Sequence, residues 1–148
     1  MTLLSGEYPA TLDDKNRLSI PAKFREGIPD NVLILTKGIE RCIWAFTQPY
    51  WEQFSAKLQA NIVPMSIKKA DMVQHRFLFS TYEAEIDRAG RIAVPQKLRD
   101  FAGLVKDCTV ISNGKRIELW DVEHYRAYEQ ASDEQLVSVL EEMGSFDV

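Results

Sequence analysis

The sequence contains one unusual phrase twice, and this repeat restricts the folds that are open to the chain. Residues 13–25 read DDKNRLSIPAKFR and residues 87–99 read DRAGRIAVPQKLR, so both carry Asp-x-x-x-Arg-x-x-x-Pro-x-Lys-x-Arg at an offset of 74. Seven of 18 aligned positions are identical: Tyr8 and Tyr82, Ala10 and Ala84, Asp13 and Asp87, Arg17 and Arg91, Pro21 and Pro95, Lys23 and Lys97, Arg25 and Arg99. Agreement of this extent is rare by chance, so the chain contains a duplicated unit.

The duplication continues downstream. LILTKG at 33–38 parallels TVISNG at 109–114, and IWAF at 43–46 parallels IELW at 117–120. Each half then leads into a helical segment that carries aromatic residues: Tyr50, Trp51 and Phe54 in the first, Tyr125 and Tyr128 in the second. Each half is therefore predicted to run strand, turn, strand, short helix, hairpin, helix.

Local patterns support these elements. Four stretches are predicted to be strands because their residues alternate with a period of two and are rich in β-branched types: RLSIP, RIAVP, NVLILT and CTVIS. Asn16 and Gly90 occupy the same turn position, and both residue types tolerate a positive φ. Pro21 and Pro95 suit the first turn of a helix, so AKFRE and QKLRDF are predicted to be short helices.

The repeat also predicts the domain organisation. We expect a first repeat at 1–60, a connecting helix within 61–80 (Ser66 to Phe79), a second repeat at 81–131 and an acidic C-terminal helix at 132–148. A repeat of about 70 residues is marginal for burying a core by itself, so the two are expected to share one core with pseudo-twofold symmetry. The predicted class is α+β, mainly β.

The last segment has features of an amphipathic helix. Ser132 and Gln135 have the spacing of a capping box, and the apolar stripe that follows consists of Leu136, Val139, Leu140 and Met143. We expect this helix to pack on its own core or on a neighbouring subunit, in preference to a foreign partner.

Charge is distributed unevenly along the chain. The net charge is -4, but residues 13–25 carry +2, residues 87–99 carry +3, and residues 118–148 carry -8. The repeated segments are thus basic although the whole chain is acidic. No apolar run is long enough to span a membrane and the N-terminal residues lack an export signal, so a cytoplasmic location without membrane association is expected.

Metal, cofactor and catalytic signatures are not found in the sequence. Cys42 and Cys108 stand singly within apolar runs, which is typical of small buried residues. His75 and His124 have no nucleophile, phosphate-binding glycine loop or ligand spacing around them. We expect no cofactor, no metal, no small-molecule substrate and no enzymatic activity.

The repeated motif admits two interpretations. Asp13 and Asp87 are expected to structure tight turns by accepting backbone N–H groups. Arg17 and Arg91 could simply pair with these carboxylates, in which case the remaining basic residues would be ordinary solvated charges. Identical spacing of basic positions in both halves is better explained by two equivalent anionic targets, such as the phosphates of a nucleic acid.

At this point the motifs support a resemblance. Two Asp-x-x-x-Arg motifs in tandem, at Asp13–Arg17 and Asp87–Arg91, together with ELW at 118–120, resemble the MraZ family of bacterial transcriptional regulators, which consist of two AbrB-like repeats. The resemblance implies a swapped-hairpin β-barrel, assembly into a homo-oligomeric ring, a nucleoid-associated location, and binding to short direct repeats in double-stranded DNA upstream of cell-division and cell-wall genes. It also implies that Arg17 and Arg91 lead the DNA contacts, with support from Lys15, Lys23, Arg25, Lys97 and Arg99.

Two other classes of function stay open beside DNA binding. An enzyme would have to use His75 or His124, for which the surrounding sequence offers no catalytic partner. An interaction module would hold a protein partner through the acidic C-terminal segment and use the repeats mainly as a scaffold.

Overall fold

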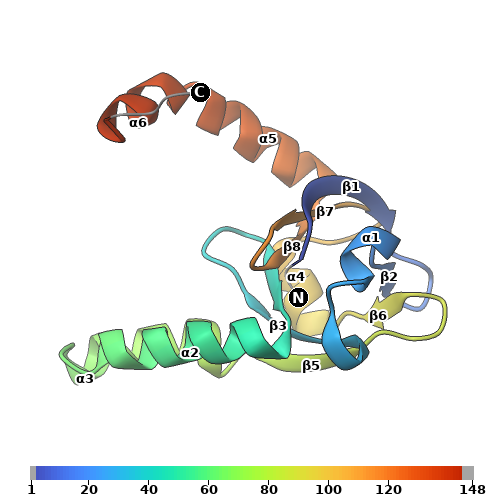
Figure 1. Ribbon diagram of the computed structural model, residues 1–148, viewed down its shortest axis with the longest axis horizontal. Coiled ribbons are helices and arrows are strands. Elements are labelled where there is room, and N and C mark those ends of the chain that lie inside the picture. The colour runs from blue at the N-terminus through green and yellow to red at the C-terminus, as the bar shows by residue number, and fades with distance from the viewer. Residues whose placement is uncertain (1–2, 145–148) are drawn as a thin grey trace.

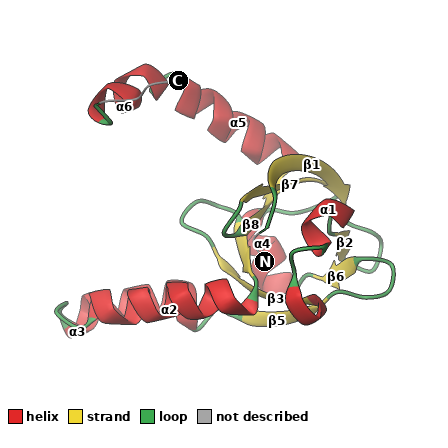
Figure 2. Ribbon diagram, viewed as in Figure 1, coloured by secondary structure: helices red, strands yellow, loops and turns green. Residues whose placement is uncertain are grey.

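Two antiparallel sheets form the body of the protein in a computed structural model that describes residues 3–144 (Figures 1 and 2). The strands are β1 (Ser5–Thr11), β2 (Arg17–Ser19), β3 (Val32–Lys37), β4 (Ile43–Phe46), β5 (Tyr82–Glu85), β6 (Arg91–Ala93), β7 (Asp107–Asn113) and β8 (Ile117–Asp121). Six of them form one sheet in the order β1-β7-β8-β4-β3-β5, and β2 pairs with β6 in a second sheet. The predicted α+β class, mainly of strands, is confirmed.

The helices follow the predicted pattern of one short helix and one longer helix in each repeat. They are α1 (Ala22–Arg25), the 3-10 turn η1 (Pro29–Asn31), α2 (Gln48–Ile62), α3 (Ile67–Val73), the π-helical turn η2 (Gln74–Leu78), α4 (Gln96–Ala102), α5 (Val122–Asp133) and α6 (Leu136–Glu142). Pro21 and Pro95 stand directly before α1 and α4. Ser66 caps α3 by accepting a hydrogen bond from the Lys69 N–H at 3.3 Å, as the predicted start of the connecting helix required.

The strand order reads the same in both directions when the repeats are exchanged. β1 of the first repeat pairs with β7 of the second, and β5 of the second pairs with β3 of the first. Residues at equivalent positions face each other directly at two places, Leu18 opposite Ile92 and Trp44 opposite Glu118. A pseudo-twofold axis therefore passes through both pairs, and each repeat completes its sheet with strands of the other.

One buried core serves both repeats. Its fully buried members include Leu18, Phe24, Leu33, Leu35 and Ile43 from the first repeat, and Ile92, Leu98, Val110, Ile117 and Leu119 from the second. Because two short repeats pool their apolar side chains, neither needs a complete core of its own. The predicted sharing of the core is confirmed.

A second, aromatic cluster holds the long helix α2 against the outer face of the large sheet. Trp44 and Phe46 of β4 contact Phe54 of α2 with ring centroids 5.9 and 5.0 Å apart, and Phe77 of η2 stacks on Trp44 at 5.6 Å. These ring contacts hold the N-terminal part of α2 and the segment α3–η2 against the sheet. In Figure 1 the two segments form one arm that leaves the body, while α5 and α6 form another.

Two details of the sequence interpretation are wrong. Ala10 pairs with Cys108, and its equivalent Ala84 pairs with Leu33. Leu33 of β3 is therefore equivalent to Cys108 of β7, an offset of 75 residues. The sequence alignment of LILTKG with TVISNG had used an offset of 76. Alternating strands look alike after a shift, and the hairpin turns of the repeats differ in length, so the pattern alone did not fix this register.

The predicted capping box is also not formed. Helix α5 continues through Ser132 to Asp133, so the Ser132 backbone is helical and cannot act as an extended N-cap. Helix α6 begins only at Leu136, after Gln135, which makes no side-chain capping bond. The last four residues of the predicted terminal segment, 145–148, lie outside the described residues.

Candidate nucleic-acid interface

The first repeated motif forms a tight loop organised by one carboxylate. Asp13 Oδ1 accepts hydrogen bonds from the backbone N–H groups of Lys15 at 2.9 Å and Arg17 at 2.8 Å, and Oδ2 accepts from Arg17 Nε at 2.8 Å. Asn16 adopts a φ of 61°, the left-handed conformation expected for this turn position. Asp13 thus accepts the backbone N–H groups of this turn.

The second motif repeats this arrangement. Asp87 Oδ1 accepts from the N–H groups of Ala89 and Arg91, both at 2.9 Å, and Oδ2 accepts from Arg91 Nε at 3.3 Å. Gly90 has a φ of 82° at the position equivalent to Asn16. The two loops are thus built by the same set of bonds.

The fold brings the two loops together at one end of the body (Figure 1). Ile20 N–H donates to Gly90 O at 2.8 Å, and the equivalent Val94 N–H donates to Asn16 O at 3.1 Å. Arg91 Nη1 also lies 3.5 Å from Asp13 Oδ2, which ties the second loop to the first. The side-by-side placement follows directly from the pairing of β2 with β6.

Arg17 and Arg91 are partly exposed in these loops. Their side chains retain 30% and 31% of their accessible surface, and in each the pairing with its own Asp uses Nε. The edge of a planar guanidinium that carries the terminal nitrogens can still meet an external oxygen in this geometry. The ion pairs are therefore present as the simpler interpretation required, and they orient the arginines.

The hydrogen bonds also change the acidity of the two carboxyl groups. The pKa of Asp13 is lowered chiefly by the backbone hydrogen bond from Arg17, and the pKa of Asp87 is lowered chiefly by that from Arg91. Both carboxyl groups thus stay ionised at neutral pH. Each loop consequently carries a fixed negative charge under its arginine.

The remaining predicted contacts fall into two groups. Lys15, Lys23 and Lys97 are exposed. Arg25 and Arg99 are half-buried, and Arg99 Nε donates to Val94 O at 3.0 Å while the guanidinium of Arg25 lies against Gly90 of the other repeat. These two arginines are thus largely held by the protein itself.

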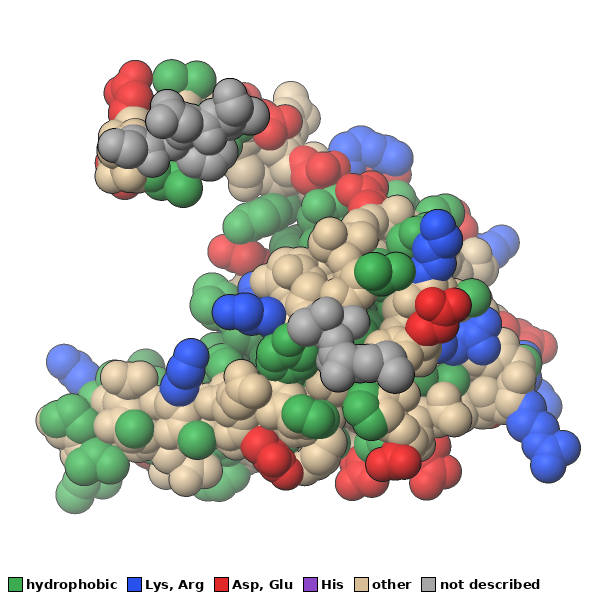
Figure 3. Space-filling view, viewed as in Figure 1, with side chains coloured by type: hydrophobic (Ala, Val, Ile, Leu, Met, Phe, Trp, Pro, Cys, Tyr) green, Lys and Arg blue, Asp and Glu red, His purple; other side chains and the backbone are tan. Residues whose placement is uncertain are grey.

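The structure adds one basic residue that was not singled out among the predicted contacts and separates another from the loops. Arg88 is exposed at the tip of the second loop, where the first loop has Asp14. Lys97 neighbours Lys37, whose pKa is lowered first by burial and then by the charge of Lys97. Figure 3 shows basic and acidic side chains interspersed at the loop end of the body.

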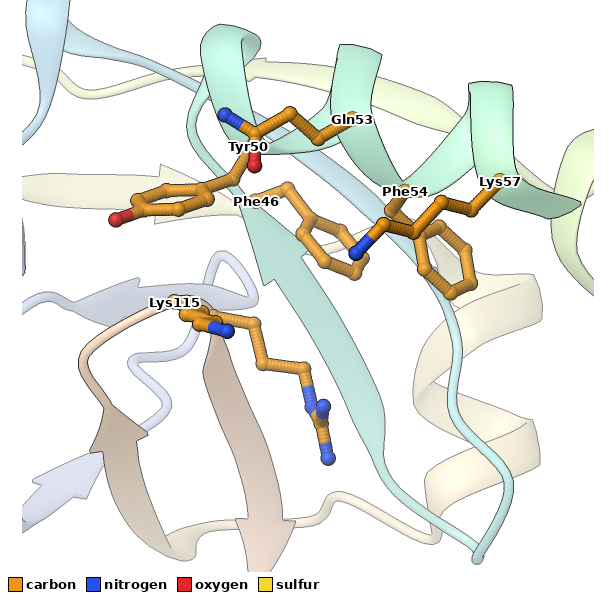
Figure 4. Close-up of a pocket in the computed structure, with 7 residues that line it drawn as sticks. Phe46, Tyr50, Gln53, Phe54, Lys57 and Lys115 are labelled. Carbon is orange, nitrogen blue, oxygen red and sulfur yellow. The ribbon is translucent and has the colours of Figure 1, made fainter.

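A pocket lies away from the loops, between α2 and the β7–β8 turn (Figure 4). Phe46, Tyr50 and Phe54 form an aromatic wall, and Lys57 and Lys115 lie at its rim. The neighbouring Arg116 stacks on Trp44 with 4.0 Å to the ring centroid and pairs with Glu118 at 2.8 Å. A pocket with an aromatic wall and a basic rim suits an amphipathic segment that carries acidic residues.

The other residues considered from the sequence are held in structural settings. Cys42 and Cys108 are both buried as free thiols, as predicted, and burial raises the pKa of Cys108 to about 11. His75 lies 3.5 Å from Asp71, and His124 lies 4.0 Å from Asp121. Residues 3–144 contain no group of three or more potential metal ligands and no helix of the length and apolar character needed to cross a membrane.

Comparison with known proteins decides the family. A family model described as "MraZ protein, putative antitoxin-like" matches residues 3–75 and again residues 77–146. The chain belongs to the MraZ family. The two matches begin 74 residues apart, which is the offset of the internal duplication.

A curated relative agrees with this membership. The transcriptional regulator MraZ of Treponema denticola is 39% identical over 143 residues, which cover 95% of this chain and 97% of that protein. A solution structure of PHS018 from Pyrococcus horikoshii aligns with 80% of this chain and 89% of its own, at 20% identity and a TM-score of 0.30. That likeness is too weak to support an argument about this MraZ chain.

Proposed function

We propose that this chain is a sequence-specific DNA-binding transcriptional regulator. Its two Asp-x-x-x-Arg loops would grip the phosphates and bases of double-stranded DNA together, with Arg17 and Arg91 as the leading contacts. The observation that carries the proposal is the placement of both loops side by side at one end of the body. The MraZ relative, which is named a transcriptional regulator, supports the same conclusion.

The supporting contacts follow from exposure and position. Lys15 and Arg88 stand at the loop tips, and Lys23 is exposed on α1 in the first repeat. Arg25 and Arg99, which bond or pack within the protein, would contribute chiefly by fixing the helices behind the loops. Lys97 would assist from the margin of this surface. Phosphate contacts of this kind position the protein, while the guanidinium edges of the loops read bases.

The finer fold and setting belong to the same proposal. The exchange of strands between repeats, with β1 on β7 and β5 on β3, supports a swapped-hairpin barrel of the AbrB type. The division into repeats at 1–60 and 81–131, with the segments 61–80 and 132–148 as additions, is kept as the domain organisation. Such a regulator would act at the nucleoid, on short direct repeats upstream of cell-division and cell-wall genes.

We further propose that the chain works as a homo-oligomer, in keeping with the expected ring. Exposed apolar side chains gather on both arms, among them Val63 and Ile67 at 81% and 91% exposure, and Leu136 and Val137 at 48% and 69%. Exposed apolar patches of this kind mark interaction surfaces. The acidic, apolar α6 of one copy complements the aromatic wall and lysine rim of the α2 pocket in the next.

Oligomerisation would matter for affinity. A single chain presents only two loops, but several chains tethered together would bind successive DNA repeats with a high effective concentration. No catalytic role is proposed, and the acidic arm is assigned to subunit contacts in preference to a foreign protein.

The experiment uses duplex DNA from immediately upstream of the chain's own coding region. Fluorescence anisotropy would compare the wild type with Arg17→Gln, Arg91→Gln and the matched control Arg126→Gln, whose arginine pairs with Glu123 on the exposed surface of α5. We expect at least a tenfold loss of specific affinity for either loop variant and none for the control. Circular dichroism would verify folding, and wild-type affinity in both folded loop variants would overturn the proposal.

A further inference from the structure

Four basic side chains from four segments gather around one phenylalanine on a surface that the proposed DNA contacts leave largely unused. We call Lys37, Arg41, Arg76, Lys97 and the ring of Phe101 the Phe101 cluster. Arg76 Cζ lies 4.6 Å from the ring centroid, and Lys37 Nζ and Arg41 Cζ each lie 5.2 Å from it. Lys97 stands one helical turn before Phe101 on α4.

Arg76 is fixed in this arrangement by the β3–β4 turn. Its Nε donates to Gly38 O at 2.9 Å and its Nη2 donates to Ile39 O at 2.9 Å. The π-helical turn η2 presents the guanidinium toward these carbonyls, and Thr36 Oγ1 anchors the same turn by donating to Phe77 O at 2.7 Å. The charge of Arg76 is thus a built feature of the fold and not the free end of a mobile side chain.

The Phe101 cluster lacks direct ion-pair partners among the described residues. None of its four cations takes part in the ion pairs found among residues 3–144. Asp71 lines the adjacent depression with Lys37 and Arg76, and among the described residues its carboxylate lies 3.5 Å from His75 and forms no ion pair with either cation. The pKa of Lys37 is lowered by burial first and then by the charges of Lys97, Arg76 and Arg41.

Contact with an aromatic ring does not remove this repulsion. Cation–π attraction is worth about 0.5–1 kcal/mol at exposed sites, and it leaves every charge in place. A bound anion would offset part of the positive charge and relieve the mutual repulsion. Four cations exceed what one carboxylate can neutralise, whereas a phosphate group carries up to two charges and several acceptor oxygens at one centre.

We propose that the Phe101 cluster is an anion site that binds a phosphate group. The β3–β4 turn, which carries Arg41, lies at the opposite end of the body from the paired loops (Figure 1), so the site is separate from the loop contacts. The phosphate could belong to a small phosphorylated compound or to a further stretch of the DNA backbone. Both sources share the chemistry that the cluster recognises.

The test is isothermal titration calorimetry, in which inorganic pyrophosphate is added to the full-length protein at low ionic strength. We expect saturable binding of one pyrophosphate per chain. Binding should weaken at least tenfold in the double variant Lys37→Gln, Arg41→Gln and stay unchanged in the control Lys106→Gln, Arg126→Gln, which loses the same charge from exposed positions elsewhere. Absence of saturable binding, or equal weakening in both double variants, would overturn the proposal.

Two further measurements identify the source of the phosphate and separate this inference from the proposed DNA-binding function. If the cluster variant loses DNA affinity and pyrophosphate competes with DNA, the phosphate comes from the DNA backbone, whereas unchanged DNA affinity indicates a small compound. The loop variant Arg17→Gln, Arg91→Gln should lose DNA binding and retain pyrophosphate binding. Each site can therefore fail without the other.

Discussion

The guanidinium of Arg25 lies against Gly90 of the opposite repeat, so closely that a Cβ atom at Gly90 would lie 2.6 Å from Arg25 Nη1. The equivalent pair, Arg99 and Asn16, is arranged differently, because Arg99 Nε bonds to Val94 O instead. Arg25 Nε is buried and has no hydrogen-bond partner among the described residues. The glycine of the second loop therefore makes room for an arginine of the first repeat.

This contact predicts that Gly90→Ala destabilises the protein for two separable reasons. An alanine at φ 82° is strained, and its Cβ would displace Arg25. The cost is expected to be roughly 1–3 kcal/mol in urea unfolding. In an Arg25→Ala background the same substitution should cost less, because only the backbone strain remains. Equal costs in both backgrounds would show that the contact with Arg25 has no energetic weight.

The exposed loop tips predict the salt dependence of DNA binding. Lys15 and Arg88 make no ion pair among the described residues, so replacing both with Gln should leave folding intact. The slope of log affinity against log salt should become shallower by about 0.9 for each phosphate that the variant no longer neutralises. Anisotropy titrations from low to high salt measure this slope, with Arg126→Gln as control. A slope identical to that of the wild type would exclude these residues from binding phosphate.

The lowered pKa of Asp13 predicts how the stability of the first loop varies with pH. A carboxyl group whose pKa is lower in the folded state stabilises the protein fully above its ordinary value of 3.8, and this contribution is lost as the pH falls through the lowered value. Asp13→Asn should therefore be less stable than the wild type at pH 7, and the difference should shrink as the pH approaches 3. Urea unfolding at several pH values provides the test.

Asp14→Asn is the control for this measurement, because Asp14 is exposed beside Asp13 and contributes none of the bonds that organise the loop. Its stability relative to the wild type should change little with pH. A constant deficit of Asp13→Asn from pH 7 to pH 3 would mean that its ionisation does not support the loop.

The exposed apolar side chains of the arms predict an effect on assembly. Leu136→Ser combined with Val139→Ser should lower the molar mass measured by light scattering, because both side chains are 48% exposed on α6 and available to a neighbouring copy. Far-UV circular dichroism should show that the body is intact. Val105→Ser removes an apolar side chain that is 80% exposed on the body, and it should leave the mass unchanged. An unchanged mass in the α6 variant would place the subunit contact elsewhere.

Local sequence signals predicted the loops well because few residue types satisfy their geometry. Asp13 and Asp87 precede turns that require a side-chain acceptor, and Asn16 and Gly90 occur where φ is positive. The shared core was also predictable. Both repeats have the same apolar pattern, and each is too small to bury a complete core by itself. These features depend on neighbours in the chain or on total apolar content.

Features that depend on the third dimension were not predictable in the same way. The offset that relates β3 to β7 depends on the turns on either side of these strands. Helix α5 continues past Ser132, where the capping pattern had predicted the start of a new helix. The convergence of Lys37 and Lys97 on Phe101 joins segments that are far apart in the sequence, and no local pattern signals it. The repeat thus predicted which residues are equivalent in the two halves. It did not predict which of them have different neighbours in the folded protein.

The direct pairing of Leu18 with Ile92 bears on how such a chain can arise. Because these positions are equivalent, the same contact would join residue 18 of one single-repeat chain to residue 18 of another. Two unduplicated copies could thus assemble as an isologous dimer with the present sheet order, before gene fusion placed both on one polypeptide. Fusion then frees each copy to diverge, as Trp44 and Glu118 have done at the other end of the axis.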